Sequence, residues 1–190
     1  MKKTNLLLAL CLLATQFTHA QFYKTILPAP DSFTDSLERI VEDFRYNFYP
    51  IQGRQLVSEG MVDIYQSNRG IPGAAHCTIQ RYHSEEDTTA SWQAVMYDGE
   101  SFDEALKVYK KTFKHIKKAK IKSAERSQYS FSGNLEVPTE SVRFTVTPLR
   151  LNTTDPEYKY FYAVVEINNN YDGWVVHLNL HSRKDDQEKY

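Results

Sequence analysis

Two histidines stand four residues apart in the run His177-Leu178-Asn179-Leu180-His181. Imidazole rings bind metal ions and act as acids or bases near neutral pH, so the pair suggests both kinds of chemistry. The alternation of leucine with polar residues predicts a β-strand, in which residues four apart lie about 13 Å from each other. Because two rings at that distance cannot bind one metal ion, the spacing argues against a metal site.

Cys77 follows His76 directly and precedes His83 by six residues, which is a candidate arrangement for a thiol nucleophile and its base. The alternation of Ala75, Cys77 and Ile79 predicts a strand, so His76 points to the opposite face and His83 lies about 20 Å along the chain. We therefore interpret Cys77 as a small buried apolar residue. A base from another strand would still allow a hydrolase whose site is assembled from several strands.

Other familiar catalytic patterns are absent from the sequence that follows residue 20. It contains no glycine-rich phosphate loop, no Gly-x-Ser-x-Gly elbow and no Cys/His metal spacing. The sequence thus leans against an enzyme, and we expect neither a metal nor any other cofactor.

The last two strand patterns are joined by an Asn-rich turn that closes with Asp172-Gly173, which is typical of a β-hairpin. A four-residue loop over residues 169–172 pairs Ile167 with Trp174 and brings the apolar residues of both strands onto one face. The other face is then polar. Its expected cross-strand pairs are His181 with Tyr160, Asn179 with Tyr162, and His177 with Val164.

An earlier strand is expected to add polar side chains to the same face. Apolar residues alternate from Val142 to Val146, so Arg143, Thr145 and Thr147 should project to the polar side. Aromatic and polar side chains of this kind bury contact area at low entropic cost and offer hydrogen bonds. An ordinary solvated sheet face, rich in Tyr and Thr for their strand propensity, explains the same pattern. The candidate ligand-binding residues are Arg143, Tyr160, Tyr162, His177, Asn179 and His181.

A row of lysines follows one side of the helix predicted from Ser101 to Lys118. Such a face suits anionic lipid headgroups or an acidic polymer. Acidic residues in the first turn with lysines later are also what the helix dipole favours, so a solvated face explains the pattern as well. The weaker candidates for membrane or polyanion contact are Lys110, Lys114, Lys117 and Lys118.

Two amphipathic helices and a set of strands must position these residues. Apolar residues recur at helical spacing from Asp31 to Phe48, and again from Ser101 to Lys118, where Ser101 and Glu104 form a capping box. Period-two alternation fills most of the remaining sequence. We predict an α+β fold, with a mostly antiparallel sheet of about six strands and both helices on one face.

The two helical segments also match each other in sequence. Ser32 to Leu37 aligns with Ser101 to Leu106, and Phe44 then falls on Phe113. Each helix is followed by about three strands, which predicts two α-β-β-β halves. A duplication and the convergence of two capped amphipathic helices both explain this match.

Residues 1–20 have the features of an export signal, with Lys2 and Lys3 before a short apolar run and Ala20 at the cleavage position. The run is nearer ten residues than the roughly 20 that a transmembrane helix needs. We expect residues 21–182 to form a single α+β domain and residues 183–190 a polar tail.

Removal of Lys2 and Lys3 changes the formal net charge from −1 to −3, which argues against nucleic acid as a partner. We therefore expect a periplasmic or secreted protein without a transmembrane segment. The leading hypothesis is a non-enzymatic domain that binds a small molecule or a protein through the polar sheet face. The alternatives are the multi-strand hydrolase and an envelope or membrane-surface binder that uses the lysine-rich helix.

Overall fold

The structure is a computed structural model that describes residues 32–84, 88–122, 128–170 and 172–182. All of them belong to one compact unit that begins at Ser32. The expected export signal and polar tail lie outside the described residues.

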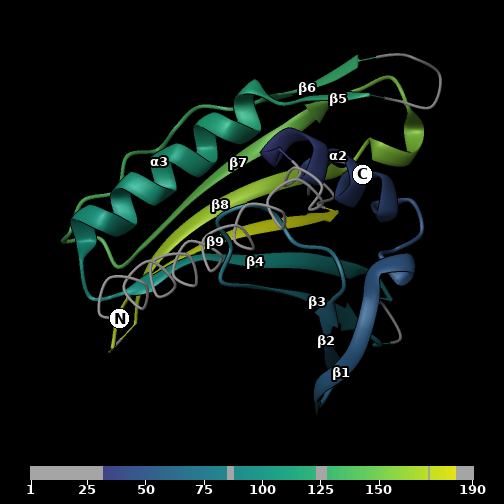
Figure 1. Cartoon of the computed structure of the whole chain (residues 1–190), viewed down its shortest axis with the longest axis horizontal. Helices are drawn as coiled ribbons and strands as arrows, with labels where there is room; N and C mark the ends of the chain where they lie inside the picture. The colour runs from purple at the N-terminus through teal and green to yellow at the C-terminus, as the bar shows by residue number, and fades with distance from the viewer. Residues whose placement is uncertain (1–31, 85–87, 123–127, 171, 183–190) are drawn as a thin grey trace, which may run out of the picture. The chain divides into compact units, whose positions relative to one another are not determined.

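The described residues form two α-helices, each followed by a series of strands (Figure 1). Helix α2 spans Phe33–Phe44 and helix α3 spans Phe102–Lys118, and two short 3-10 helices, η2 and η3, span Tyr49–Ile51 and Pro156–Tyr158. The strands are β1 Gln52–Glu59, β2 Val62–Ser67, β3 His76–Tyr82, β4 Ala90–Gly99, β5 Lys120–Lys122, β6 Gln128–Ser132, β7 Phe144–Asn152, β8 Phe161–Asn170 and β9 Gly173–Ser182.

All nine strands form one antiparallel sheet in the order β1-β2-β3-β4-β9-β8-β7-β6-β5. The predicted α+β class, antiparallel sheet and two helices are confirmed, but the expected number of about six strands is wrong. The two strands without a sequence signal are the edges. Strand β1 is exposed along most of its length, and β5 has three residues, so neither needs a long alternation of apolar and polar residues.

The order of strands places the two halves of the chain side by side. Four strands follow α2 and five follow α3, and the last strand of each half, β4 and β9, pair with each other in the middle of the sheet. Each half is therefore a helix followed by an antiparallel meander, with β5 as an additional short strand in the second half. This shared topology leaves both common origin and convergence as explanations of the matching helices.

Both helices begin at the serines that align in the sequence. The Ser32 hydroxyl accepts a hydrogen bond from the Asp35 N–H at 3.1 Å, and the Ser101 hydroxyl accepts one from the Glu104 N–H at 3.3 Å. The capping box of α3 is closed indirectly: the Ser101 N–H donates to the Tyr97 hydroxyl, which donates to the Glu104 carboxylate. Both N-caps thus occur where the sequence predicts them.

The first helix is shorter than expected because the chain turns after Phe44. Asn47 and Phe48 adopt positive φ angles of 52° and 59°, which no helix can continue. Phe48 is nevertheless fully buried, so the turn rather than the helix carries it into the core. Its helical spacing from Phe44 was therefore misleading.

One face of the sheet forms the hydrophobic core with the helices, and we call it the covered face. It carries Phe161 and Val165 of β8, which belong to the same core cluster as Leu37 of α2 and Phe113 of α3. Phe44 of α2 meets the Phe161 ring edge-on at 4.7 Å between centroids. Helix α3 lies along this face, and α2 lies beside its C-terminal half (Figure 1).

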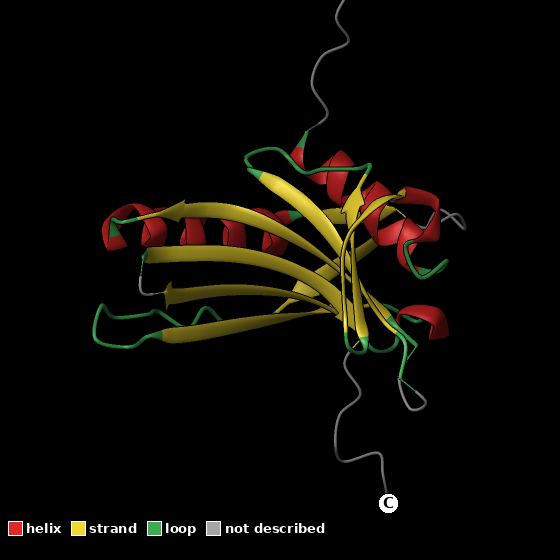
Figure 2. Ribbon diagram, turned by 90° about the horizontal axis from the view of Figure 1, so that it is seen from below, coloured by secondary structure: helices red, strands yellow, loops and turns green. Residues whose placement is uncertain are grey.

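The opposite face carries the alternate residues of the same strands, and we call it the open face. Its buried valines, Val95, Val164 and Val175, are not members of the core cluster around the two helices. The strands are strongly bent and twisted across the sheet, as Figure 2 shows. Among the described residues, no helix is both long and apolar enough to cross a lipid bilayer.

Candidate functional site

Four of the six candidate ligand-binding residues share the open face. Tyr162 of β8 and His177, Asn179 and His181 of β9 alternate with core residues such as Leu178. The structure therefore brings together the part of the candidate site that lies on the last hairpin.

The predicted register of that hairpin is wrong by two residues. The pairing begins with Asn170 opposite Gly173, so the hairpin is tighter than the expected four-residue loop. Gly173 has a φ of 142°, in the region that favours glycine. A shift of two residues changes every cross-strand partner but keeps each side chain on its face. The observed pairs are His181 with Tyr162, Asn179 with Val164, and His177 with Glu166.

Strand β7 has the opposite phase from the one predicted. Thr145 and Thr147 are buried on the covered face, whereas Phe144 has 56% of its surface exposed. The phase is set by Leu149 and Leu151, which are buried in the core later in the same strand. Because alternation is strict along a strand, these two leucines place the threonines in the core and Phe144 outside.

Arg143 is not part of the open face. It lies one residue before β7 and is exposed, and its carbonyl accepts a hydrogen bond from the Asn169 N–H at 2.8 Å. Tyr160 also lies outside the sheet, in the turn before β8. Its hydroxyl accepts a hydrogen bond from the Lys159 ammonium at 2.9 Å. The structure therefore separates both residues from the four on the hairpin.

A chain of amide side chains crosses four neighbouring strands of the open face. Gln80 of β3 donates to the Gln93 oxygen at 3.2 Å, and Gln93 of β4 donates to the Asn179 oxygen at 2.9 Å. Asn179 of β9 is in turn hydrogen-bonded to the carboxyl group of Glu166 on β8. Gln93 and Asn179 each use the oxygen toward one neighbour and the nitrogen toward the next. We call these four residues the amide chain.

The amide chain ends on a carboxyl group that is half-buried. Burial raises the pKa of Glu166 above its usual value of 4.5, and the hydrogen bond from Asn179 opposes part of that rise. When Glu166 is ionised, the donor at each link of the chain points toward the negative charge, so the hydrogen bonds reinforce one another. The charge on Glu166 thus affects how firmly the hydrogen bonds of the chain hold Gln80, three strands away.

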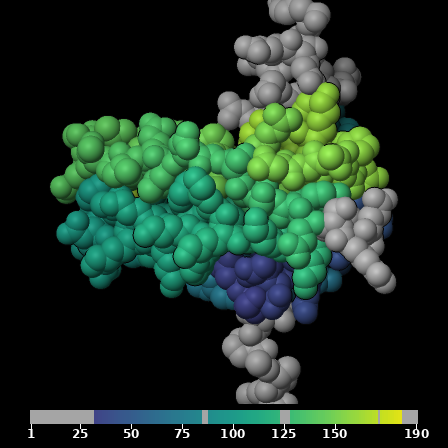
Figure 3. All heavy atoms as spheres, turned by 90° about the horizontal axis from the view of Figure 1, so that it is seen from above, coloured from purple at the N-terminus to yellow at the C-terminus, as the bar shows by residue number. Residues whose placement is uncertain are grey.

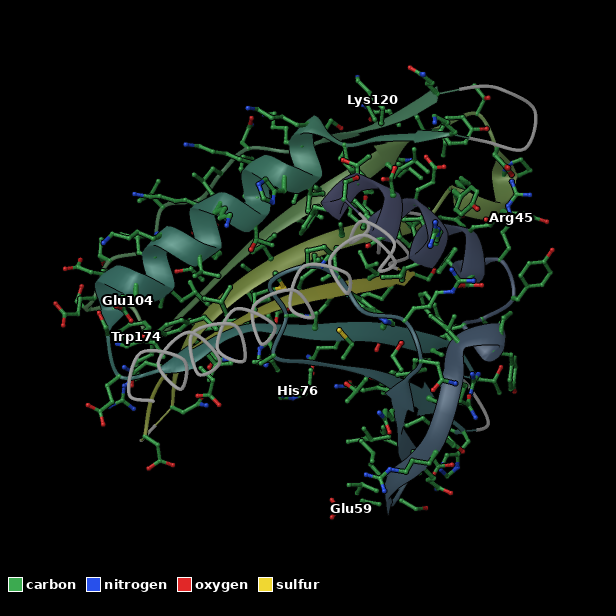
Figure 4. The ribbon with its side chains drawn as sticks, in the orientation of Figure 1. Arg45, Glu59, His76, Glu104, Lys120 and Trp174 are labelled. Atoms are coloured by element: carbon green, nitrogen blue, oxygen red, sulfur yellow. The ribbon has the colours of Figure 1, made fainter. Side chains whose placement is uncertain are left out.

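Two histidines lie in the cross-strand row that contains Glu166. His76 of β3 and His177 of β9 both pair with Val95 of β4, so they lie two strand spacings apart, about 10 Å. Burial lowers the pKa of His177, the neighbouring His76 lowers it further, and Asp98 opposes the change. Figure 4 shows His76 directed away from the helices. This row places two imidazoles and a carboxyl group, all able to form hydrogen bonds, side by side on the open face.

Glu166, Gln80, Gln93 and His76 were not among the residues predicted from the sequence. Glu166 did carry a signal, because it is the one charged residue in the otherwise apolar run from Ala163 to Ile167. The two glutamines carried none. They resemble any polar residue that alternates with buried ones, and only the pairing of β3 with β4 and of β4 with β9 joins them.

Cys77 lies on the covered face opposite Ala94, and His76 points to the other face, as alternation predicts. The thiol is partly buried against the core, and burial raises its pKa. A raised pKa decreases the thiolate population, which is the reverse of what a nucleophile needs. The Nε2 atom of His83 lies 3.8 Å from a carboxylate oxygen of Asp63, not beside Cys77.

The lysine candidates of α3 lie on the outer side of the helix. Lys114, Lys117 and Lys118 are exposed and Lys110 is half-buried. The Lys117 ammonium donates to the carbonyl of Gly133 at 2.8 Å and lies 5.5 Å from the centre of the Phe113 ring. This side of α3 forms the teal surface at the front of Figure 3.

No group of three or more His, Cys, Asp or Glu side chains in the described part of the chain is arranged to hold a metal ion. Comparisons of the chain with protein-family models, with curated proteins and with solved structures found no match.

Proposed function

We propose that this chain is an exported, non-enzymatic binding protein that holds a small molecule or a protein partner on the open face of its sheet. The observation that carries the proposal is the amide chain of Gln80, Gln93, Asn179 and Glu166 across four strands. Tyr162 and His181, which pair with each other, border it on the same face.

The physical state of these side chains supports a binding role. They are half-buried or buried, so their rotamers are restricted before a ligand arrives. Binding to pre-ordered side chains loses less conformational entropy than binding to mobile ones. The valines between them, Val95 and Val164, are themselves buried and help to fix the neighbouring polar side chains.

The chemical groups on the open face also indicate which kind of ligand it would recognise. Amide, phenol and imidazole groups offer donors and acceptors with little net charge, which suits a neutral hydrogen-bonding surface better than a polyanion. The same groups are not arranged as a nucleophile with its base, so the chemistry available to them is recognition.

The test compares variants of the immobilised protein, without the first 20 residues, for capture from the exported fraction of the cells that produce it. Tyr162→Ser should reduce capture by at least about tenfold, because an aromatic contact at an interface contributes about 2 kcal/mol or more. Its melting behaviour should change little, since Tyr162 lies outside the core.

The matched control is Tyr49→Ser, a tyrosine with 62% of its surface exposed in η2. We expect this variant to capture the partner as well as the native protein does. Undiminished capture by Tyr162→Ser would remove the open face as the binding site. Loss of capture in the Tyr49→Ser variant alone would move the site to η2.

A further inference from the structure

A second candidate site is a cavity of about 330 Å³ on the outer side of α2, away from the open face. Helix α2 forms one wall, β5 and β6 form another, and η3 closes the end. This volume is at the lower end of the range of small-molecule sites in proteins. Its lining residues are Glu38, Glu42, Arg45, Tyr46, Ile121, Lys122, Tyr129 and Tyr158, and we call it the Tyr158 pocket.

The floor of the Tyr158 pocket is rigid and aromatic. Tyr158, Tyr129 and Ile121 are all buried. The Tyr158 ring stacks on Phe44 with 6.0 Å between centroids and meets the Tyr129 ring edge-on at 6.4 Å. These contacts hold the rings in place before a ligand binds, so little conformational entropy would be lost on binding.

Arg45 contributes structure to the pocket rather than an available charge. Its guanidinium binds the carboxylate of Asp155, approaches that of Glu157 at 3.1 Å, and donates to the Tyr158 hydroxyl at 2.9 Å. It also lies 4.9 Å from the centre of the Tyr158 ring. Figure 4 shows Arg45 at the end of α2, next to the segment that carries η3. An anionic ligand would therefore compete with two carboxylates for this cation.

The remaining wall is acidic. Glu38 and Glu42 lie one turn apart on the same side of α2, and both line the cavity. The Glu38 carboxylate accepts a hydrogen bond from the Lys122 N–H at 3.0 Å, which ties α2 to β5. The lining holds two carboxylates and two cations, and one of the cations, Arg45, is already paired with Asp155 and Glu157, which lie outside the lining. Because that pairing neutralises Arg45, the two glutamates outnumber the remaining cation, Lys122, which favours a cationic ligand.

We propose that the Tyr158 pocket binds a small organic ammonium ion. The ammonium group pairs with the carboxylates of Glu42 and Glu38, and its alkyl carbons pack on Tyr129 and Ile121. The Tyr46 ring at the mouth supplies a further aromatic face, which attracts a cation through its quadrupole. Aromatic walls combined with carboxylates are the chemistry that recognises alkylated amines, whereas a hydrated metal ion gains nothing from the rings.

The experiment titrates the protein, without the first 20 residues, with choline and with butylammonium, followed by NMR chemical shifts or calorimetry. We expect both ions to bind with a dissociation constant of about 1 mM or tighter, and to perturb the signals of Tyr129 and Tyr46. Acetate is the matched anion and should not bind in the pocket. Binding of acetate without binding of either amine would overturn the proposal.

Two variants test whether the Glu42 carboxylate and the Tyr46 ring contact the ligand. Glu42→Gln keeps the shape of the wall and should weaken binding of both amines by about fivefold or more. Tyr46→Ala removes an exposed ring without opening the core, and it should weaken choline more than butylammonium because quaternary ammonium ions depend more on aromatic contacts. The matched control is Glu59→Gln, which removes a carboxylate at the far tip of the β1–β2 hairpin (Figure 4). Equal weakening by Glu59→Gln, or none by Glu42→Gln, would contradict a specific site.

Discussion

On the covered face of the sheet, a buried threonine is held by fixed structural hydrogen bonds, whereas on the open face polar side chains are joined in a chain across strands. The Thr147 hydroxyl, fully buried, is hydrogen-bonded to the Tyr109 hydroxyl and accepts a bond from the Glu136 N–H at 3.0 Å. On the other face, Gln93 and Asn179 link neighbouring strands through their side chains and reach Glu166.

Under the proposed function, the covered face stabilises the fold and the open face binds the ligand. A polar group under the helices has no access to water, so a lost partner would leave it unsatisfied at a large cost. Most polar side chains on the open face are only half-buried, so water can more easily replace a lost partner there. Substitutions on the covered face should therefore change the free energy of unfolding, and those on the open face should change binding.

The largest effect is expected from neighbouring residues of β8 that point to opposite faces. Phe161→Ala should lower the free energy of unfolding by about 3–5 kcal/mol, because Phe161 is fully buried between Phe44 and Phe131. Tyr162→Ala should cost about 1 kcal/mol or less, since its ring lies outside the core. Urea unfolding of both variants measures the two losses in free energy of unfolding. Similar losses would contradict the distinction between the covered face and the open face.

A smaller effect is expected from hydroxyl groups on the two faces. Thr147→Val keeps the shape of the side chain but leaves the Glu136 N–H without its partner and removes one of the two hydrogen bonds of the Tyr109 hydroxyl, at a cost of about 1–3 kcal/mol. Thr78→Val is the matched change on the open face and should cost about 0.5 kcal/mol or less. If Tyr109→Phe and Thr147→Val act through one bond, the double variant should cost less than the sum of the two single variants.

The smallest effect concerns the pH dependence of stability. Because the pKa of Glu166 is raised on folding, the folded chain takes up this proton first as pH falls toward the usual carboxyl value of 4.5, which adds stability. The pKa of His177 is lowered, so below about pH 6.5 the unfolded chain takes up that proton first and stability is lost. Glu166→Gln removes the first contribution and keeps the second.

Acidification from pH 7 to pH 4.5 should therefore destabilise Glu166→Gln more than the native protein, each relative to its own stability at pH 7. Urea unfolding at a series of pH values measures this. Glu140→Gln removes an exposed carboxylate and serves as the control. Parallel pH profiles for the native protein and Glu166→Gln would show that Glu166 is not held in a desolvated position.

Residues close together in the chain were predicted well, because their structure depends on local hydrogen bonds and on alternation. The serine caps of both helices, the face of β8 that carries Phe161 and Val165, and the placement of His177 and Asn179 on the other face all follow from short segments. The hairpin register did not, because Asn168 to Asn170 are compatible with loops of different length and only the pairing with Gly173 selects one.

Longer-range features depended on contacts that no short segment contains. The phase of β7 follows from Leu149 and Leu151 meeting the core, which overrides the apolar pattern around Phe144. The amide chain requires β3, β4, β9 and β8 to be neighbours, although Gln80 and Asn179 are far apart in the sequence. The Tyr158 pocket likewise combines α2, β5, β6 and η3. Local periodicity specifies which side of an element a residue occupies, but packing between distant elements decides which residues meet there.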